Sequence, residues 1–335
     1  MKRVGIIGCG HIAARGHQSA YGDLADRITV AAVADPAPER RDLLGDNCHV
    51  PPEARHADYR DLLARDDLDF VDICLPHHLH HPATLAAAEA GVNILLEKPI
   101  AAREDEALEM IAAVEKAGVV FSLIHNYSRQ TVPASVVELV HAGAIGTPYL
   151  MRYEGFGDYH YLGTAAYDPS WRADAGRGGG GALLDNGYHS IYLARYVMQS
   201  EVKEVFGAVG TFAREFSVED TALALLRHES GAITSIQNGW GADRSMPARE
   251  VQGSEGSILL RGNTERPIEL WKGDHCEYPK PSPKSSDGYT SILTEFCAAL
   301  DGKGSVPTPA EDGLMNLRII LAAYEASRTS SVITL

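Results

Sequence analysis

The chain has 335 residues, of which 45% are hydrophobic and 22% charged, and this length and composition predict a folded protein of two domains. The net charge of −15 argues against nucleic acid and anionic membrane surfaces as partners, and no stretch approaches the roughly 20 apolar residues of a membrane-spanning helix. The five cysteines are scattered and form no CxxC pair, so a reducing, cytoplasmic location is expected.

The first 125 residues alternate short, continuously apolar runs with helical patterns. The runs at 3–8, 27–35, 69–76, 92–99 and 119–126 predict strands, and the stretches between them predict helices. Apolar strands separated by helices are typical of a parallel sheet that is covered on both faces. Residues 1–125 are therefore expected to form an α/β domain with a doubly wound parallel sheet.

The turn after the first strand, residues 8–13, reads GCGHIA, a GxGxxA pattern. Gly8 suits the tight turn, Gly10 lets the backbone approach a pyrophosphate, and the next helix points its first amides at the phosphates. Asp35 ends the second strand, where a carboxylate accepts hydrogen bonds from ribose hydroxyls and repels a 2′-phosphate. We expect NAD rather than NADP, although the arginines at 40–41 could hold a 2′-phosphate. An α/β turn without a nucleotide is the alternative.

Four histidines, His77, His78, His80 and His81, follow the third clear strand. Neighbouring loop residues do not readily converge on one ion and the usual ligand spacings are absent, so we predict no metal site. Ligands bind at the carboxyl ends of the strands in such sheets, and His80 is therefore expected at the edge of the cofactor pocket.

Lys98 stands in the run LLEKPIA, at the carboxyl end of another buried strand. Burial and nearby groups can lower the pKa of a lysine and make it useful in acid–base chemistry. A solvated lysine at a strand end is the alternative interpretation.

The alternation stops near residue 126. One more helix is predicted at 129–146, followed by β-type runs at 147–157, 202–213, 221–240, 249–262 and 267–273 and by two closing helices near 290–300 and 311–329. Strands that follow one another without helices predict a largely antiparallel sheet. Residues 126–335 are therefore expected to form an α+β domain with a large, mostly antiparallel open sheet.

The stretch GGGGALLDNGYHSIYLARYV, residues 178–197, predicts a buried helix with one polar stripe. At 100° per residue, Asp185, His189, Tyr192 and Tyr196 share one face, and the rest of the helix is apolar. Buried polar groups need partners, so the stripe indicates either a ligand or an internal ladder of hydrogen bonds. The four glycines would leave room for a bound ring or provide a flexible lid.

The segment before this helix concentrates aromatic residues, although only 7% of the chain is aromatic. Aromatic faces pack against the C–H faces of sugars and cyclitols, whereas ordinary core packing explains some of these residues. Arg172 and Arg177 are the basic residues of this segment and form no larger cluster with other Lys or Arg residues, which disfavours a phosphorylated substrate. The aromatic residues are Tyr153, Phe156, Tyr159, Tyr161, Tyr167 and Trp171.

These motifs resemble the Gfo/Idh/MocA family of NAD(P)-dependent sugar and inositol dehydrogenases over essentially the whole chain. The similar segments are GIIGCGHIA, EKPIA, SRQTVPASVVELVHAGAIGTP, the W-R pair with GGGGALLDNGYH, and EDGLMNLRIILAAYEASRTSS. The resemblance implies a Rossmann domain joined to an α+β domain whose open sheet makes homodimer or homotetramer contacts. It also implies a cis peptide between Lys98 and Pro99.

Catalytic roles for Lys98, Asp185 and His189 follow from the same resemblance. His189 is expected to take the proton of a ring hydroxyl as the hydride passes to the nicotinamide, Lys98 to stabilise the developing alkoxide, and Asp185 to orient His189 and hold a neighbouring hydroxyl. The chain departs from the family at Tyr192, where the family often has a second acid. An NAD-using glycosidase and a nucleotide-binding sensor without turnover are the alternative functions.

Two sets of binding residues complete the expected site. The cofactor-binding residues are Gly8, Gly10, His11, Ile12, Asp35, Arg40, Pro76, His80, Glu97 and Lys98. The residues that bind the polyol or sugar substrate are Lys98, Asn126, Tyr159, Trp171, Arg172, Asp185, His189 and Tyr192.

Overall fold

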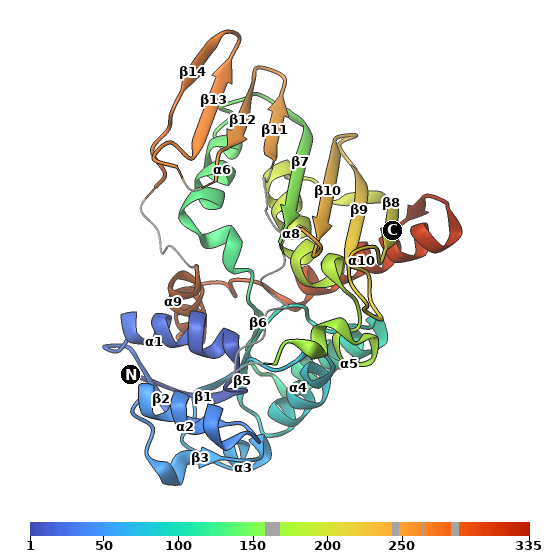
Figure 1. Cartoon of the computed structure of the whole chain (residues 1–335). Coiled ribbons are helices and arrows are strands. Elements are labelled where there is room, and N and C mark those ends of the chain that lie inside the picture. Colours follow the sequence, from blue (N-terminus) through green and yellow to red (C-terminus); the bar gives the residue numbers. More distant parts are fainter. Residues whose placement is uncertain (158–167, 243–247, 263, 283–287) are drawn as a thin grey trace.

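The computed structural model describes residues 1–157, 168–242, 248–262, 264–282 and 288–335. In these residues the strands form two sheets, one in each half of the chain (Figure 1). No helix in the described ranges is long and apolar enough to cross a membrane.

The first sheet is parallel, with its strands in the order β3-β2-β1-β4-β5-β6, and it confirms the predicted doubly wound Rossmann topology. The order of the strands reverses between β1 and β4, and in open sheets such a reversal opens a crevice at the carboxyl ends of the strands. The strands are β1 (Lys2–Ile7), β2 (Ile28–Ala34), β3 (Arg55–His56), β4 (Phe70–Ile73), β5 (Asn93–Leu96) and β6 (Phe121–Leu123). The helices are α1 (Gln18–Asp23), α2 (Pro38–Asn47), α3 (Tyr59–Leu63), α4 (His80–Glu89) and α5 (Glu104–Ala117), with short turns of helix at η1 (Ala13–His17), η2 (Pro52–Ala54) and η3 (His77–Leu79).

The sequence explains these elements locally. Val4, Ile6 and Ile7 of β1 and Phe70 of β4 are at most 1% exposed, as expected for strands covered on both faces. Helix α5 starts with three acidic residues, which favour its N-terminus, and ends at Gly118, whose φ of 67° is the left-handed conformation of a helix C-cap.

The second sheet runs in the order β14-β13-β12-β11-β7-β10-β9-β8-β15 and is mostly antiparallel, as predicted. Only β7 and β10 pair in parallel among the strands described in this sheet. The strands are β7 (Pro148–Phe156), β8 (Val202–Gly210), β9 (Thr221–His228), β10 (Ile233–Gly239), β11 (Arg249–Gly253), β12 (Gly256–Leu260), β13 (Ile268–Lys272), β14 (His275–Glu277) and β15 (Ile333–Thr334). The helices of this half are α6 (Thr131–His141), α7 (Ala175–Gly178), α8 (Tyr188–Met198), α9 (Tyr289–Leu300) and α10 (Ala310–Thr329), with short turns at η4 (Asn126–Arg129), η6 (Ser170–Ala173) and η7 (Leu183–Gly187).

The last two helices tie the halves together. Helix α9 lies beside α1 of the first half (Figure 1), where the Thr290 hydroxyl donates to Asp23 over 2.9 Å. Helix α10 contacts α5, and Arg318 pairs with Glu104 at 2.7 Å. The second half of the chain thus returns to pack against the first. The domain boundary at residue 126 stays a prediction.

Candidate active site

A cleft of about 420 Å³ opens at the carboxyl ends of the parallel strands and is lined by residues from both halves of the chain. It brings together most of the residues that we expected to bind cofactor or substrate. These are Gly8, Gly10, His11, Ile12, Asp35, Arg40, Pro76, Glu97, Lys98, Asn126, Trp171, Arg172, Asp185 and His189.

The glycine turn forms one end of this cleft. Gly8 has a φ of +95° and lies so close to β4 that a Cβ there would be 2.6 Å from the carbonyl oxygen of Cys74, whereas the space beside Gly10 is open. The Asp35 carboxylate accepts hydrogen bonds from the backbone N–H of Cys9 and of Ala37, both over 2.8 Å. An open glycine backbone beside a fixed carboxylate fits the pyrophosphate and ribose of a dinucleotide.

Lys98 and Asp185 meet from opposite halves of the chain. The Lys98 Nζ lies 2.5 Å from Oδ1 of Asp185, and Arg172 Nε donates to Oδ2 over 3.0 Å. The Arg172 guanidinium also lies over the Trp171 ring, 4.3 Å from its centroid. Two cations thus neutralise a carboxylate that is only 4% exposed. The peptide between Lys98 and Pro99 is cis, as predicted.

The His189 ring is held by a hydrogen bond to Tyr192 and by stacking on Tyr127. Its Nδ1 lies 2.7 Å from the Tyr192 hydroxyl, and the Tyr127 ring stacks on it with centroids 4.0 Å apart. Asp185 lies in a π-helical turn, η7, that precedes α8, so the stripe does not follow a uniform α-helix. The hydrogen bonds described for Asp185 reach Lys98 and Arg172, and the orienting role that we expected for it toward His189 stays a prediction.

Three expected site residues are not placed in the cleft. His80 is fully buried, and its ring nitrogens lie 2.7 Å from the carbonyl oxygen of Pro99 and 2.9 Å from that of Leu75. It therefore joins the backbone that follows β4 to the backbone that follows β5. Tyr192 is also fully buried, behind His189. Tyr159 lies outside the described residues.

The histidine loop joins the two halves of the chain. His77 Nδ1 donates to the carbonyl oxygen of Gly178 over 2.8 Å, and His78 Nδ1 donates to that of Arg177 over 3.1 Å. His81 instead pairs with Glu109 at 2.8 Å. Two of the four histidines thus fasten the Rossmann half to the glycine-rich turn before Asp185.

The glycine run is explained by contacts with the protein itself. Gly179 has a φ of +81°, a conformation that side chains other than glycine rarely adopt. A Cβ on Gly181 would collide with the backbone carbonyl of Glu219, and the carboxylate of Glu219 accepts the N–H of Gly181 over 2.9 Å. The run therefore lets the backbone pack closely, which differs from the ring-sized space that we expected there.

A buried cluster beneath Lys98 was missed in the sequence. His17 Nδ1 lies 2.6 Å from Asp72 and Nε2 lies 3.0 Å from Glu97. Burial disfavours a charged imidazole, but Asp72, together with Cys74, outweighs it and raises the pKa of His17 well above its ordinary value. The Sγ of Cys74 lies within 4.8 Å of the His17 and Asp72 side-chain atoms that could bind a metal ion. The signal available was a histidine inside the apolar helix that follows the glycine turn.

Glu97 connects this buried cluster to the cleft through its hydrogen bonds. One of its oxygens accepts the Tyr289 hydroxyl over 3.0 Å, and the other accepts the backbone N–H of Lys98 over 3.0 Å. Glu97 and Tyr289 both line the cleft. Glu97 thus positions the backbone of Lys98, and its expected part in cofactor binding stays a prediction.

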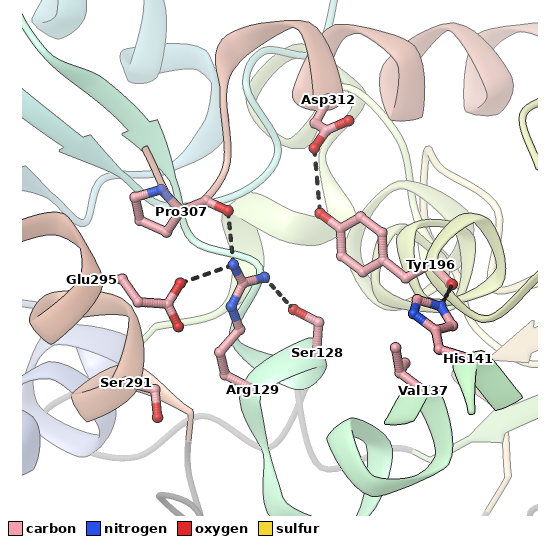
Figure 2. Close-up of a pocket in the computed structure, with 9 residues that line it drawn as sticks. All are labelled: Ser128, Arg129, Val137, His141, Tyr196, Ser291, Glu295, Pro307 and Asp312. Carbon is pink, nitrogen blue, oxygen red and sulfur yellow. Dashed lines mark hydrogen bonds and ion pairs between the residues drawn. The ribbon is translucent and has the colours of Figure 1, made fainter. Parts of the chain in front are cut away.

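A second pocket, of about 560 Å³, is lined in part by Ser128 and Arg129 of η4 (Figure 2). There Arg129 pairs with Glu295 at 3.0 Å and donates to the carbonyl oxygen of Pro307 over 2.8 Å. Tyr196, the last residue of the predicted polar stripe, faces this pocket and lies 3.5 Å from Asp312. The stripe is thus divided, because His189 and Asp185 line the cleft whereas Tyr196 lines the second pocket.

The parallel sheet and the glycine turn at its switch point are those of an oxidoreductase with an NAD-binding Rossmann fold. Residues 2–125 match the family model described as "Oxidoreductase family, NAD-binding Rossmann fold", and residues 134–259 match that of the GFO/IDH/MocA C-terminal domain. The chain belongs to the Gfo/Idh/MocA family of NAD-binding sugar and polyol oxidoreductases.

Individual relatives are similar over most of their length. The oxidoreductase YrbE of Bacillus subtilis is 30% identical, and the match covers 96% of this chain and 93% of that protein. The 1,5-anhydro-D-fructose reductase of Ensifer adhaerens is 28% identical over 80% of each chain. A structure of levoglucosan dehydrogenase in complex with NADH and levoglucosan is 25% identical and superposes with a TM-score of 0.86 over 99% of each chain.

Proposed function

We propose that this protein is an NAD-dependent dehydrogenase or reductase that moves a hydride between the nicotinamide and a ring carbon of a sugar, cyclitol or related polyol. The observation that carries the proposal is the convergence of Lys98, Asp185 and His189 in the cleft that also holds the glycine turn. The names of the relatives, a reductase of an anhydro-fructose and a levoglucosan dehydrogenase, support a sugar-like substrate.

The residues divide the work between holding the cofactor and moving a proton. NAD, when bound, supplies the hydride acceptor or donor. The turn at Gly8 and Gly10 would cradle its pyrophosphate, and Asp35 would accept the ribose hydroxyls. His189 takes the proton of the substrate hydroxyl as general base, and the Lys98 ammonium stabilises the charge that develops on the oxygen.

Asp185 holds the Lys98 ammonium at 2.5 Å and in this way fixes the cation where the alkoxide forms. We also propose that it accepts a neighbouring substrate hydroxyl. The Trp171 ring, which lines the same cleft, offers an apolar surface to the C–H face of the substrate.

The test is a panel of sugars and cyclitols with NAD, and of their ketones with NADH, read by nicotinamide absorbance. Turnover of at least one substrate is expected. Release of a sugar without net change in absorbance would instead indicate the glycosidase, and tight NAD binding without turnover of any compound would indicate the sensor.

His189→Ala then tests the mechanism on the best substrate. It should lower kcat by roughly 10²–10⁴-fold, the range of a positioned acid–base group, with little change in NAD affinity. The control is His275→Ala, which removes an exposed imidazole from β14. Combining His189→Ala with Lys98→Met should cost much less than the product of the single effects, because the residues act as a unit.

We further propose that two copies associate through the open face of the second sheet. Helices α8 and α10 pack against this sheet, whereas Phe206, Leu225 and Ile233 are between 37% and 43% exposed on its strands. Exposed apolar side chains on one face favour an interface between copies. Light scattering should give a dimer or tetramer, and a monomer that persists at high concentration would contradict this.

A further inference from the structure

We infer that Tyr192 is a positioning residue for His189, whose hydroxyl holds Nδ1 and so fixes the orientation of the imidazole ring beside the cleft. This inference rests on the proposed function, in which His189 is the general base. It assigns Tyr192 to a place behind His189 rather than to contact with the substrate, which was its expected role.

The position of Tyr192 is fixed by two hydrogen bonds. It follows His189 by three residues on α8, and its hydroxyl oxygen lies 2.7 Å from Nδ1. The same oxygen accepts the backbone N–H of Tyr127 over 3.0 Å. Tyr192 is fully buried, so water does not compete for these contacts.

Two stacked pairs of rings hold the geometry. The Tyr192 ring lies on His125 with centroids 4.1 Å apart and an interplanar angle of 8°. The Tyr127 ring lies on His189 with centroids 4.0 Å apart and an angle of 10°. Tyr127 therefore contacts both partners, through its backbone and through its ring, and a rotation of His189 would break the contact with Tyr192.

The chemistry of a phenol suits this role. The hydroxyl oxygen accepts the backbone N–H of Tyr127 with one lone pair, and its second contact is the hydrogen bond with Nδ1 of His189. This bond fixes the orientation of the imidazole ring. Burial raises the pKa of Tyr192 well above its ordinary value, so the residue orients His189 without adding a negative charge.

The charged groups around His189 determine how a charge at position 192 would change the pKa of His189. The titratable and charged groups that line the cleft come from both halves of the chain, and the His125 ring stacks on Tyr192. A carboxylate at position 192 would add an anion directly at Nδ1. The groups in the cleft are His11, Arg15, Asp35, Arg40, Cys74, His77, Glu97, Lys98, Tyr127, Asp168, Arg172, Asp185 and Tyr289.

Two substitutions separate positioning from packing. Tyr192→Phe keeps the ring and its stack on His125 but removes the hydroxyl. It should lower kcat by roughly 10- to 100-fold, because a misplacement of about 1 Å costs on the order of 10² in rate, and it should leave KM and NAD affinity nearly unchanged. Tyr192→Asp should move the rising limb of the pH profile of kcat upward by about one unit or more, because a carboxylate stabilises the imidazolium.

Tyr188→Phe is the matched control. Tyr188 is also fully buried on α8, but its hydroxyl lies 3.3 Å from Nε2 of His125 and not against His189. This variant should keep the wild-type kcat and pH profile. Equal losses of kcat in Tyr188→Phe and Tyr192→Phe would overturn the inference, because the effect would then be one of packing.

The remaining outcomes separate this inference from the proposed function. Wild-type kcat in Tyr192→Phe, with His189→Ala inactive, would overturn the role of Tyr192 and leave the proposed base in place. Wild-type kcat in His189→Ala would reject the base itself. If a Tyr192 variant does not fold, ¹⁵N NMR of His189 in the wild-type enzyme decides: a hydrogen bond at Nδ1 is expected, and an Nδ1 without a hydrogen bond would overturn the inference.

Discussion

The Nδ1 of His77 donates a hydrogen bond to the carbonyl oxygen of Gly178, 2.8 Å away, and so joins the loop after β4 to the turn that precedes Asp185. The His77 ring also packs edge-on against Trp171, with centroids 4.8 Å apart. Because a neutral imidazole suffices to donate one hydrogen bond to a carbonyl, this junction works without charge on His77.

The stability of the fold should depend on the neutrality of His77. Burial is the main cause that lowers the pKa of His77 well below its ordinary value. Below about pH 6.5 the unfolded chain takes up a proton that the folded chain excludes. The free energy of unfolding therefore falls by about 1.4 kcal/mol for each unit by which the pH is lowered, as the contribution of this group. His77→Asn should flatten the dependence between pH 5 and about pH 6.5, as measured by urea unfolding.

His17 provides a comparison of opposite sign. Burial opposes its charge, but Asp72 and its neighbours raise the pKa of His17 well above its ordinary value. Its stabilising contribution is complete below about pH 6.5 and is lost as the pH rises through the folded-state pKa. His17→Asn should therefore alter the pH dependence of the free energy of unfolding between about pH 6.5 and the folded-state pKa, and not below about pH 6.5. An unchanged acid slope in His77→Asn would show that the junction tolerates a charged imidazole.

Gly181→Ala should destabilise the protein. Its Cβ would collide with the backbone carbonyl of Glu219, which cannot move aside as a flexible side chain can. We expect a loss of about 1–3 kcal/mol or more in the free energy of unfolding, measured with denaturant. Gly22→Ala in α1 is the control, because a Cβ there meets nothing within 4 Å, and it should be neutral or stabilising by up to about 1 kcal/mol.

Asp35 should set the choice between NAD and NADP. A 2′-phosphate beside this carboxylate is repelled, although Arg40 lines the same cleft. Calorimetric titration should show tighter binding of NAD, and Asp35→Ser should narrow the gap. Glu53→Ser removes one negative charge at an exposed position and should leave the ratio unchanged. Tighter binding of NADP by the wild-type protein would refute the prediction.

Lys98→Met should abolish most turnover without abolishing NAD binding. It removes the ammonium that lies 2.5 Å from Asp185 and leaves the volume of the side chain nearly the same. A loss of roughly 10²–10⁴-fold in kcat is expected if the ammonium acts on the reacting oxygen. Lys116→Met, at an exposed position on α5, should keep wild-type rates, and a fully active Lys98→Met would exclude Lys98 from the chemistry.

The sequence by itself determined the two kinds of sheet and the glycine turn, and it predicted Lys98, Asp185 and His189 as site residues. The sheets and the turn rest on local patterns, namely apolar runs between helices and a glycine spacing after a strand, whereas the site residues also rest on the family resemblance. Local patterns could not detect β3, which has only two residues, and the expected contact of Tyr192 with the substrate stays a prediction.

Only the tertiary structure decided what each of these side chains contacts. Lys98 meets Asp185 across 87 residues of chain, and His77 meets Gly178 across 101. Asp185 lies in the π-helical turn η7 and pairs with Lys98 and Arg172, whereas His189 on α8 pairs with Tyr192. Periodicity fixes which face of its own helix a residue occupies, whereas the partner on the facing element depends on how the two halves pack, because no local spacing encodes that distance.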